Sequence, residues 1–254
     1  MSFRLSRLAL PGIFLLCGGL FMAGSSIAGT PADTTVAKQL RSALEASSNG
    51  LTVESIEVSE IPGIYAVQFA NGPLVYSTAT GDHFVLGDMF RTEPGGFINL
   101  AELRRDDVRK RKIGTIETED MIVFSPATPP RATITVFTDV TCFYCQKLHK
   151  EVPELNKRGV EVRYLAYPRA GLASDGYRQL ASAWCSDNPQ ETLTKLKNKQ
   201  NVPDNVCSSN PIASQYELGQ EVGVRGTPAI VMESGKMLPG YQTADELIAT
   251  LGLD

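Results

Sequence analysis

Hydrophobic and polar positions in the first part of the chain follow a helical period. Between residues 34 and 48 the apolar positions fall on one stripe, and they are Val36, Leu40, Ala43 and Leu44. This spacing predicts an amphipathic helix. Asp33 or Thr34 is the expected N-cap, and Asn49-Gly50 is the expected end of the helix.

The apolar period then shortens to two, which is typical of strands. The expected strands and turns are Tyr65 to Phe69, the turn Asn71-Gly72, Leu74 to Ser77, the turn Gly81-Asp82, and Phe84 to Leu86. Together with the preceding helix, these strands predict a module of about 60 residues, a helix followed by an antiparallel meander. The stability of this module as an isolated unit would be marginal. A module of this kind is often completed by a partner copy.

Charged residues dominate the next segment, from Asn99 to Lys112, where Leu100, Leu103 and Val108 are the few apolar positions. This composition favours a solvated helix. At this place in the chain, the helix is expected to link two domains.

A different pattern follows the proline-rich residues 126–130. Thr133 to Val140 is a β-branched run typical of a buried strand, Cys142 to Lys150 has helical character up to Pro153, and Val160 to Ala166 again has strand character. A strand, a helix and a strand, with a CxxC motif at the first junction, predict a thioredoxin-type βαβ unit.

The overall composition is that of a globular protein. The chain has 254 residues, 43% hydrophobic and 20% charged, which allows one large or two modest domains. The formal net charge is -4, and the longest basic run is Arg109 to Lys112. Nucleic acid is therefore not an expected partner.

The N-terminus has the order of a secretory signal peptide. Two arginines precede an apolar stretch from about Leu8 to Ala23, and small residues end at Ala28. The stretch contains proline and glycine and is shorter than the roughly 20 residues of a transmembrane anchor. A lipid anchor on Cys17 is a weaker alternative, because the bulky Leu16 precedes it. We expect residues 1–28 to be removed on export.

Export would change the charge and the cysteine count. Loss of Arg4, Arg7 and Cys17 takes the net charge from -4 to -6 and leaves four cysteines, which are Cys142, Cys145, Cys185 and Cys207. An even number of cysteines in an oxidising compartment indicates disulfides.

The segment Cys142-Phe143-Tyr144-Cys145 is the candidate redox centre. At a helix start, unpaired N–H groups and the positive end of the helix dipole would favour the thiolate of Cys142 and lower its pKa. Cys145 lies one turn further on and is expected to be less exposed, within reach of a mixed disulfide on Cys142. We expect Cys142 to attack and Cys145 to resolve.

A zinc site is the alternative interpretation of these cysteines. The sequence has no second CxxC motif, and His83 and His149 are its only histidines. These residues do not complete a tetrahedral set at the usual spacing. We therefore expect no metal and no other cofactor.

Gly226-Thr227-Pro228 supplies a second element, ahead of an apolar run from Ala229 to Met232. In thioredoxin-like folds a proline at this place is cis and packs beside the active disulfide, although only about 5–6% of X–Pro bonds in folded proteins are cis. An ordinary turn proline is the alternative. If Pro228 is cis, Thr227 offers its backbone to an extended substrate segment, as in strand addition.

Cys185 and Cys207 lie in a polar stretch after Trp184, between the two halves of the predicted fold. A pair of buried free thiols is the alternative to a disulfide. In an oxidising compartment a bridge over this loop would add on the order of 3 kcal/mol to stability, so we interpret the pair as a structural disulfide.

Two segments of the sequence carry a family resemblance. One is Phe137 to Cys145, followed by Lys147-Leu148-His149, and the other is Gly223 to Ile230, continuing to Leu238-Pro239-Gly240-Tyr241-Gln242. Both resemble segments of the DsbC family of bacterial periplasmic disulfide isomerases. The N-terminal module, the charged helix and the second cysteine pair also occur in the same order, so the resemblance covers nearly the whole mature chain. Phe143 stands where a glycine is expected, and Gln146 where the family often has histidine.

The resemblance implies an α+β fold. Its expected parts are a signal peptide (1–28), an N-terminal dimerisation domain of one helix and an antiparallel sheet (29–95), a linker helix with a connecting segment (96–125), and a C-terminal thioredoxin-like α/β domain with a helical insertion (126–254). Phe143, Tyr144, Thr227 and Pro228 are the expected substrate contacts.

The resemblance also implies a periplasmic homodimer, V-shaped, that rearranges incorrect disulfides in misfolded exported proteins within an uncharged cleft. A membrane electron donor of the DsbD type would keep Cys142 and Cys145 reduced. The long N-terminal module favours an isomerase over a monomeric oxidant of the DsbA kind. Two alternatives stay open, a DsbG-like reductase of sulfenic acids and a dimeric folding chaperone.

Overall fold

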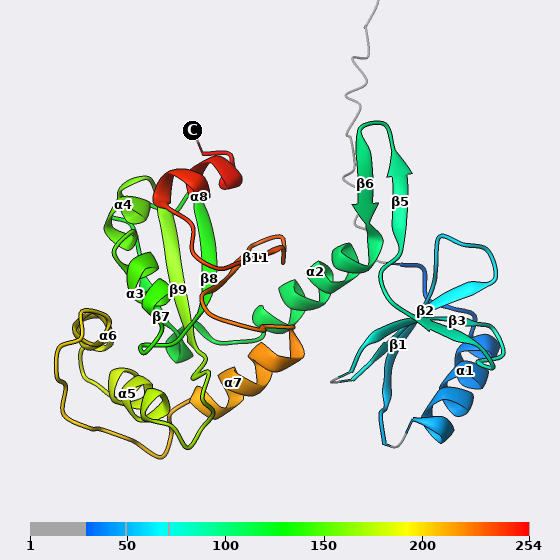
Figure 1. The fold of residues 1–254 in the computed structure, drawn as a ribbon, viewed down its shortest axis with the longest axis horizontal. Coiled ribbons are helices and arrows are strands. Elements are labelled where there is room, and N and C mark those ends of the chain that lie inside the picture. The colour runs from blue at the N-terminus through cyan, green and yellow to red at the C-terminus, as the bar shows by residue number, and fades with distance from the viewer. Residues whose placement is uncertain (1–28, 49, 71, 254) are drawn as a thin grey trace, which may run out of the picture.

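The computed structural model describes residues 29–48, 50–70 and 72–253 (Figure 1). The expected signal peptide and Cys17 lie outside these residues. In the described ranges, no helix combines the length and the apolar character that a membrane span requires.

The N-terminal unit packs one helix against an antiparallel sheet. Its elements are α1 (Thr34–Ser47), β1 (Val53–Val58), β2 (Ile64–Phe69), β3 (Leu74–Thr78) and β4 (Phe84–Leu86). The strands pair in chain order, so β1 and β4 form the two edges. The carboxylate of Asp33 caps α1 by accepting a hydrogen bond from Thr35 N at 2.8 Å. The predicted helix and meander are confirmed.

The core of this unit lies between α1 and the sheet. Leu40 and Leu44 of α1 are buried against apolar side chains of the strands, which are Val53, Ile56, Val67, Phe69 and Val75. Burial of this single helix face is what holds α1 on the sheet.

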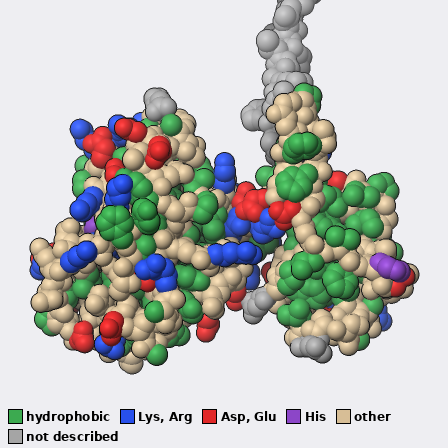
Figure 2. Space-filling view, in the orientation of Figure 1, with side chains coloured by type: hydrophobic (Ala, Val, Ile, Leu, Met, Phe, Trp, Pro, Cys, Tyr) green, Lys and Arg blue, Asp and Glu red, His purple; other side chains and the backbone are tan. Residues whose placement is uncertain are grey.

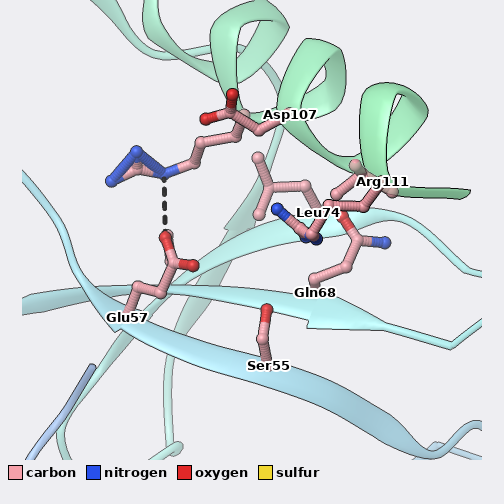
Figure 3. Close-up of a pocket in the computed structure, with 9 residues that line it drawn as sticks. Ser55, Glu57, Gln68, Leu74, Asp107 and Arg111 are labelled. Carbon is pink, nitrogen blue, oxygen red and sulfur yellow. Dashed lines mark ion pairs between the residues drawn. The ribbon is translucent and has the colours of Figure 1, made fainter. Parts of the chain in front are cut away.

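A hairpin and a helix connect this unit to the next. They are β5 (Phe90–Glu93), β6 (Gly96–Asn99) and α2 (Leu100–Ile113). The prediction that this helix is solvated is wrong, because α2 is buried at both of its ends. Near its start, Arg104 lies 4.0 Å from Glu57 of β1, beside the small pocket drawn in Figure 3. Near its end, Arg109 Nε donates to Val222 O at 3.0 Å.

The C-terminal unit is a mixed sheet covered by helices (Figure 1). Its elements are η1 (Thr118–Asp120), β7 (Ile122–Phe124), β8 (Ala132–Thr138), α3 (Phe143–His149), α4 (Val152–Lys157), β9 (Val160–Ala166), α5 (Asp175–Trp184), α6 (Pro189–Lys197), α7 (Ile212–Glu221), β10 (Ala229–Met232), β11 (Met237–Pro239) and α8 (Ala244–Leu251). The sheet order is β11-β10-β8-β9-β7, and only β8 and β9 run parallel.

Strand β8 is buried on both faces, which accounts for its continuous apolar run. Val136 belongs to the core on one side of the sheet and Phe137 to the core on the other. The helical region before Pro153 is shorter than predicted. Helix α3 ends at His149, and Pro153 lies in the first turn of α4, where its missing N–H costs no hydrogen bond.

Candidate active site

Cys142 lies directly after β8 and is the N-cap residue of α3. Its sulfur accepts a hydrogen bond from Cys145 N at 3.3 Å, which satisfies one of the unpaired donors at the helix start. Cys142 and Cys145 are both free thiols. The helix therefore places the two sulfur atoms one turn apart, with a backbone donor aimed at Cys142.

The second segment of the site is the loop before β10. The Thr227–Pro228 peptide bond is cis, and Cys142 Sγ donates to Thr227 O at 3.2 Å. Strand β10 pairs with β8, and this pairing brings the loop to the same end of the sheet as the CxxC segment. Residues that are far apart in the sequence thus meet at one thiol.

The expected contrast in exposure between the two cysteines is small in the structure. Cys142 is 2% exposed and Cys145 is 1% exposed. As the N-cap, Cys142 turns its side chain inward, over the helix start and against Thr227. The exposed surface at this point comes instead from Phe143 and Tyr144, whose exposed fractions are 65% and 55%.

The two thiols differ in their ionisation. A hydrogen bond from the Cys145 thiol is the largest effect on Cys142 and outweighs burial, so that the pKa of Cys142 falls from its ordinary value of 9.0 to about 5. Burial raises the pKa of Cys145 far above its ordinary value. At neutral pH, Cys142 is therefore the thiolate and Cys145 the thiol, which is the state required for an attacking and a resolving pair.

The loop between β8 and Cys142 is held by Asp139, which is 1% exposed. One carboxylate oxygen accepts from Thr141 N at 2.8 Å and from Thr141 Oγ1 at 2.7 Å. The other accepts from Arg169 N at 2.9 Å and from Arg169 Nε at 3.2 Å. Burial alone would raise the pKa of Asp139, but these hydrogen bonds hold it below its ordinary value. Asp139 and Arg169 were not among the predicted site residues.

Comparison with known proteins identifies the family. The thioredoxin-like domain family matches residues 118–253, and the family described as the disulfide bond isomerase protein N-terminal domain matches residues 28–102. The chain is 34% identical over 218 residues to the thiol:disulfide interchange protein DsbC of Dickeya dadantii, covering 85% of this chain and 88% of that protein. It is 36% identical over 202 residues to DsbC of Salmonella typhimurium, covering 80% and 82%.

The chain belongs to the DsbC family. The predicted resemblance and the α+β fold class are confirmed, and the protein is a thiol:disulfide oxidoreductase. Among solved structures, Proteus mirabilis ScsC in a transitional conformation matches with a TM-score of 0.50 and 17% identity, over 59% of this chain and 78% of that one. This last likeness concerns the fold alone.

Two further cysteines of this DsbC-family chain form a disulfide. Cys185, at the end of α5, is joined to Cys207 with a Cα–Cα distance of 5.7 Å. The bridge ties the end of α5 to the loop that precedes α7. It is separate from the thiols of the CxxC segment.

His149, considered above as a zinc ligand, is part of the core. Its ring nitrogens lie 3.0 Å from Tyr164 Oη and 2.9 Å from Thr194 Oγ1. Burial, and then the charge of Lys197, lower the pKa of His149 to about 3, so the ring is neutral. In the part of the chain that the structure describes, no group of three or more His, Cys, Asp or Glu side chains is arranged to hold a metal ion.

Proposed function

We propose that this oxidoreductase is a periplasmic disulfide isomerase and reductase that acts on misfolded exported proteins, with Cys142 as nucleophile and Cys145 as resolving thiol. The observation that carries the proposal is the unequal ionisation of two adjacent thiols, one at the N-cap of α3 and one beneath it. Membership of the DsbC family supports the substrate class.

The chemistry follows from thiol–disulfide exchange. The Cys142 thiolate attacks a substrate disulfide, a mixed disulfide forms, and a substrate thiolate leaves. If Cys145 then attacks Cys142, the substrate is released reduced. If a thiol of the substrate attacks instead, the substrate leaves with a rearranged disulfide and Cys142 is regenerated. Isomerisation therefore requires that the substrate stay bound while its own cysteines compete with Cys145.

Substrate contacts are proposed at the residues around Cys142. Phe143 and Tyr144 supply exposed aromatic surface beside the nucleophile, with ring centroids 5.4 Å apart. Thr227 lies against the Cys142 thiol from the opposite segment, and Pro228 follows it across the cis bond. An extended substrate strand laid along this loop would present its disulfide to Cys142.

A homodimer through the N-terminal unit would supply the binding surface. Strand β4 lies at the edge of its sheet, and its residues Phe84, Val85 and Leu86 are 59%, 67% and 66% exposed. Figure 2 shows hydrophobic side chains gathered over this unit. An exposed apolar edge strand is a template for pairing with another chain, and we propose a second copy of this chain as its occupant.

The same proposal includes the export of the protein, the roles of its parts and the source of its electrons. Residues 1–28 act as a signal peptide, residues 29–95 dimerise, residues 96–125 link, and residues 126–254 catalyse. A DsbD-type membrane donor returns electrons to the dithiol after each reduction. Thiol trapping in cells tests this part of the proposal, because Cys142 and Cys145 should be mostly reduced in an isomerase and mostly oxidised in an oxidant.

Refolding of scrambled ribonuclease with catalytic amounts of the protein tests isomerisation, and recovery of activity is expected. Val85→Asp should separate the dimer by placing charge on the edge strand, and isomerisation should fall while reduction of a small disulfide persists. Val206→Asp is the control, because Val206 is similarly exposed (47%) but lies in the C-terminal unit. Failure to refold ribonuclease, or a full-length monomer in light scattering, would contradict the proposal.

A further inference from the structure

Lys197, the last residue of α6, is buried under the active site. It is 2% exposed, although lysine is rarely buried unless its charge is paired. Helix α6 belongs to the helical insertion, and the side chain of Lys197 reaches from it to the end of β8. The reaction scheme above makes no use of this charge.

The hydrogen bonds of Lys197 go to neutral oxygen atoms and not to an anion. Its Nζ donates to Thr138 Oγ1 at 2.5 Å and to Asp139 O at 3.0 Å. Within the described residues, Lys197 forms no ion pair, because the carboxylate of Asp139 is engaged by Arg169. Two neutral acceptors do not compensate fully for the desolvation of an ammonium group.

The backbone of Asp139 connects this ammonium to both active-site cysteines. The carbonyl oxygen that accepts from Lys197 also accepts from Cys142 N at 3.3 Å. The backbone of Asp139 also favours the thiolate form of Cys145 and so opposes the rise in its pKa. Lys197 and Cys145 thus both interact with Asp139.

The groups that face Lys197 leave it mainly protonated at neutral pH. Burial lowers its pKa to about 8, while Cys145, Asp139 and Cys142 act in the opposite direction and Arg169 adds to the lowering. The ring of Tyr164 lies 5.8 Å from Nζ. A buried ammonium that stays protonated and has no carboxylate as a hydrogen-bond partner can stabilise an anion that forms only during the reaction.

We propose that the ammonium of Lys197 is the counter-charge for the Cys145 thiolate in the resolving step, and that it sets how a mixed disulfide divides between reduction and isomerisation. The inference rests on the proposed roles of the two cysteines. Lys197 is a positioning residue here, since it acts on the sulfur of Cys145 through its charge.

The step balances without a further reactant. Cys145 loses its proton, and its thiolate, stabilised by Lys197, attacks the sulfur of Cys142. The Cys142–Cys145 bond forms and the bond from Cys142 to the substrate breaks, so the enzyme pair is oxidised and the substrate reduced. The substrate sulfur leaves with the electron pair and takes up one proton, which replaces the proton lost by Cys145. Lys197 keeps its own protons throughout.

Removal of this charge should slow resolution and leave attack unchanged. Full-length Lys197→Met is mixed in stopped flow with 5,5′-dithiobis(2-nitrobenzoate), which releases one thionitrobenzoate on attack by Cys142 and a second on resolution by Cys145. A higher pKa of Cys145 reduces its thiolate but makes that thiolate more nucleophilic, so the second phase should slow by roughly three- to tenfold. The ratio of isomerase to reductase activity should rise by a similar factor.

Three comparisons make the result specific. Lys195→Met is the matched control, because Lys195 lies on the same helix but is half exposed and pairs with Glu191. Lys197→Gln also removes the charge while keeping a donor for Asp139 O. It replaces Lys197→Met in the experiment if the methionine variant does not fold. In a Cys142→Ala background, the thiolate absorbance of Cys145 should appear at higher pH in either Lys197 variant.

The outcomes separate this inference from the proposed function. Two phases in the parent protein, with only the second slowed in the variants, support the inference. Equal slowing of both phases, an unchanged second phase, or an unchanged titration of Cys145 would overturn it while the proposed function stands. A parent protein that releases no second thionitrobenzoate would instead contradict the proposed role of Cys145.

Discussion

The sulfur of Cys142 lies 3.2 Å from the carbonyl oxygen of Thr227, and 85 positions of sequence separate these two residues. The hydroxyl of Thr227 is buried beside the same thiol and has no hydrogen-bond partner among the described residues. Once Cys142 ionises, its sulfur can only accept, and the Thr227 hydroxyl becomes a donor for the thiolate. This donor is one of the effects that lower the pKa of Cys142, after the Cys145 thiol.

Thr227→Val should therefore raise the pKa of Cys142. Valine matches threonine in shape, so the loop should keep its place while the donor is lost. A hydrogen bond to a charged group contributes about 1.5 kcal/mol or more, which corresponds to an upward shift of about one pH unit. The pH dependence of iodoacetamide alkylation measures this, and an unchanged midpoint would show that the hydroxyl does not reach the thiolate.

Stability of the reduced protein should depend on pH through Cys142. Its pKa is about 5 in the folded protein and 9.0 ordinarily, so folding favours the thiolate. That stabilisation is complete above the ordinary pKa, declines as pH falls, and is absent below about 5. Cys145 has a raised pKa and is protonated in both states below pH 8, so it contributes nothing there.

The free energy of unfolding of the reduced protein, minus that of the oxidised protein, should therefore rise from pH 5 to pH 8. Urea denaturation of both forms at several pH values measures this difference, in which groups common to both forms largely cancel. A difference that falls with pH would contradict the assignment of the low pKa to Cys142.

The elements best predicted from sequence were those with compact apolar runs between turn residues. Phe84 to Leu86 and Val160 to Ala166 have the predicted bounds. Strand β1 was missed because a register shift between Val53 and Ser55 breaks its period of two. The burial of α2 was missed because its charged side chains form ion pairs and hydrogen bonds with both units, and composition alone does not reveal these contacts.

The same limit applies to the site. The CxxC motif and the cis bond before Pro228 were predictable from local sequence. Arg169 and Lys197 were not, because each is brought to Asp139 by tertiary contacts, from 30 and 58 positions away. Lys197 lies in a polar stretch that has the composition of a solvated helix end, and only the packing of α6 shows that it is buried.

Replacement of both Cys185 and Cys207 by alanine should lower the stability of the oxidised protein by about 3 kcal/mol, because the disulfide restricts a loop with a sequence separation of 22. Trp184 is the only tryptophan and adjoins Cys185, so its fluorescence reports unfolding. The midpoint of urea denaturation measures the loss. In the presence of a strong reductant, the parent and the variant should become nearly equal in stability. A stability difference that persists would show that packing of the sulfur atoms, and not the disulfide bond, is responsible.

Single serine substitutions separate the roles of the active pair. Cys142→Ser should abolish both reductase and isomerase activity, because a serine hydroxyl is not ionised at neutral pH and cannot replace the thiolate. Cys145→Ser keeps the attacking thiolate but removes the internal route of release. Mixed disulfides should then accumulate, and isomerisation should persist only as far as thiols of the substrate displace Cys142.

A non-reducing gel of Cys145→Ser incubated with scrambled ribonuclease detects the trapped complexes, and Cys142→Ser is the matched control in which none should form.

The low pKa of Cys142 also predicts which thiol reacts first. At limiting iodoacetamide and neutral pH, the reduced parent should carry its label on Cys142, because the pKa of Cys145 is raised by burial and leaves almost no thiolate. Label on Cys145 before Cys142 would reverse the two roles, and the argument from the N-cap of α3 would then fail.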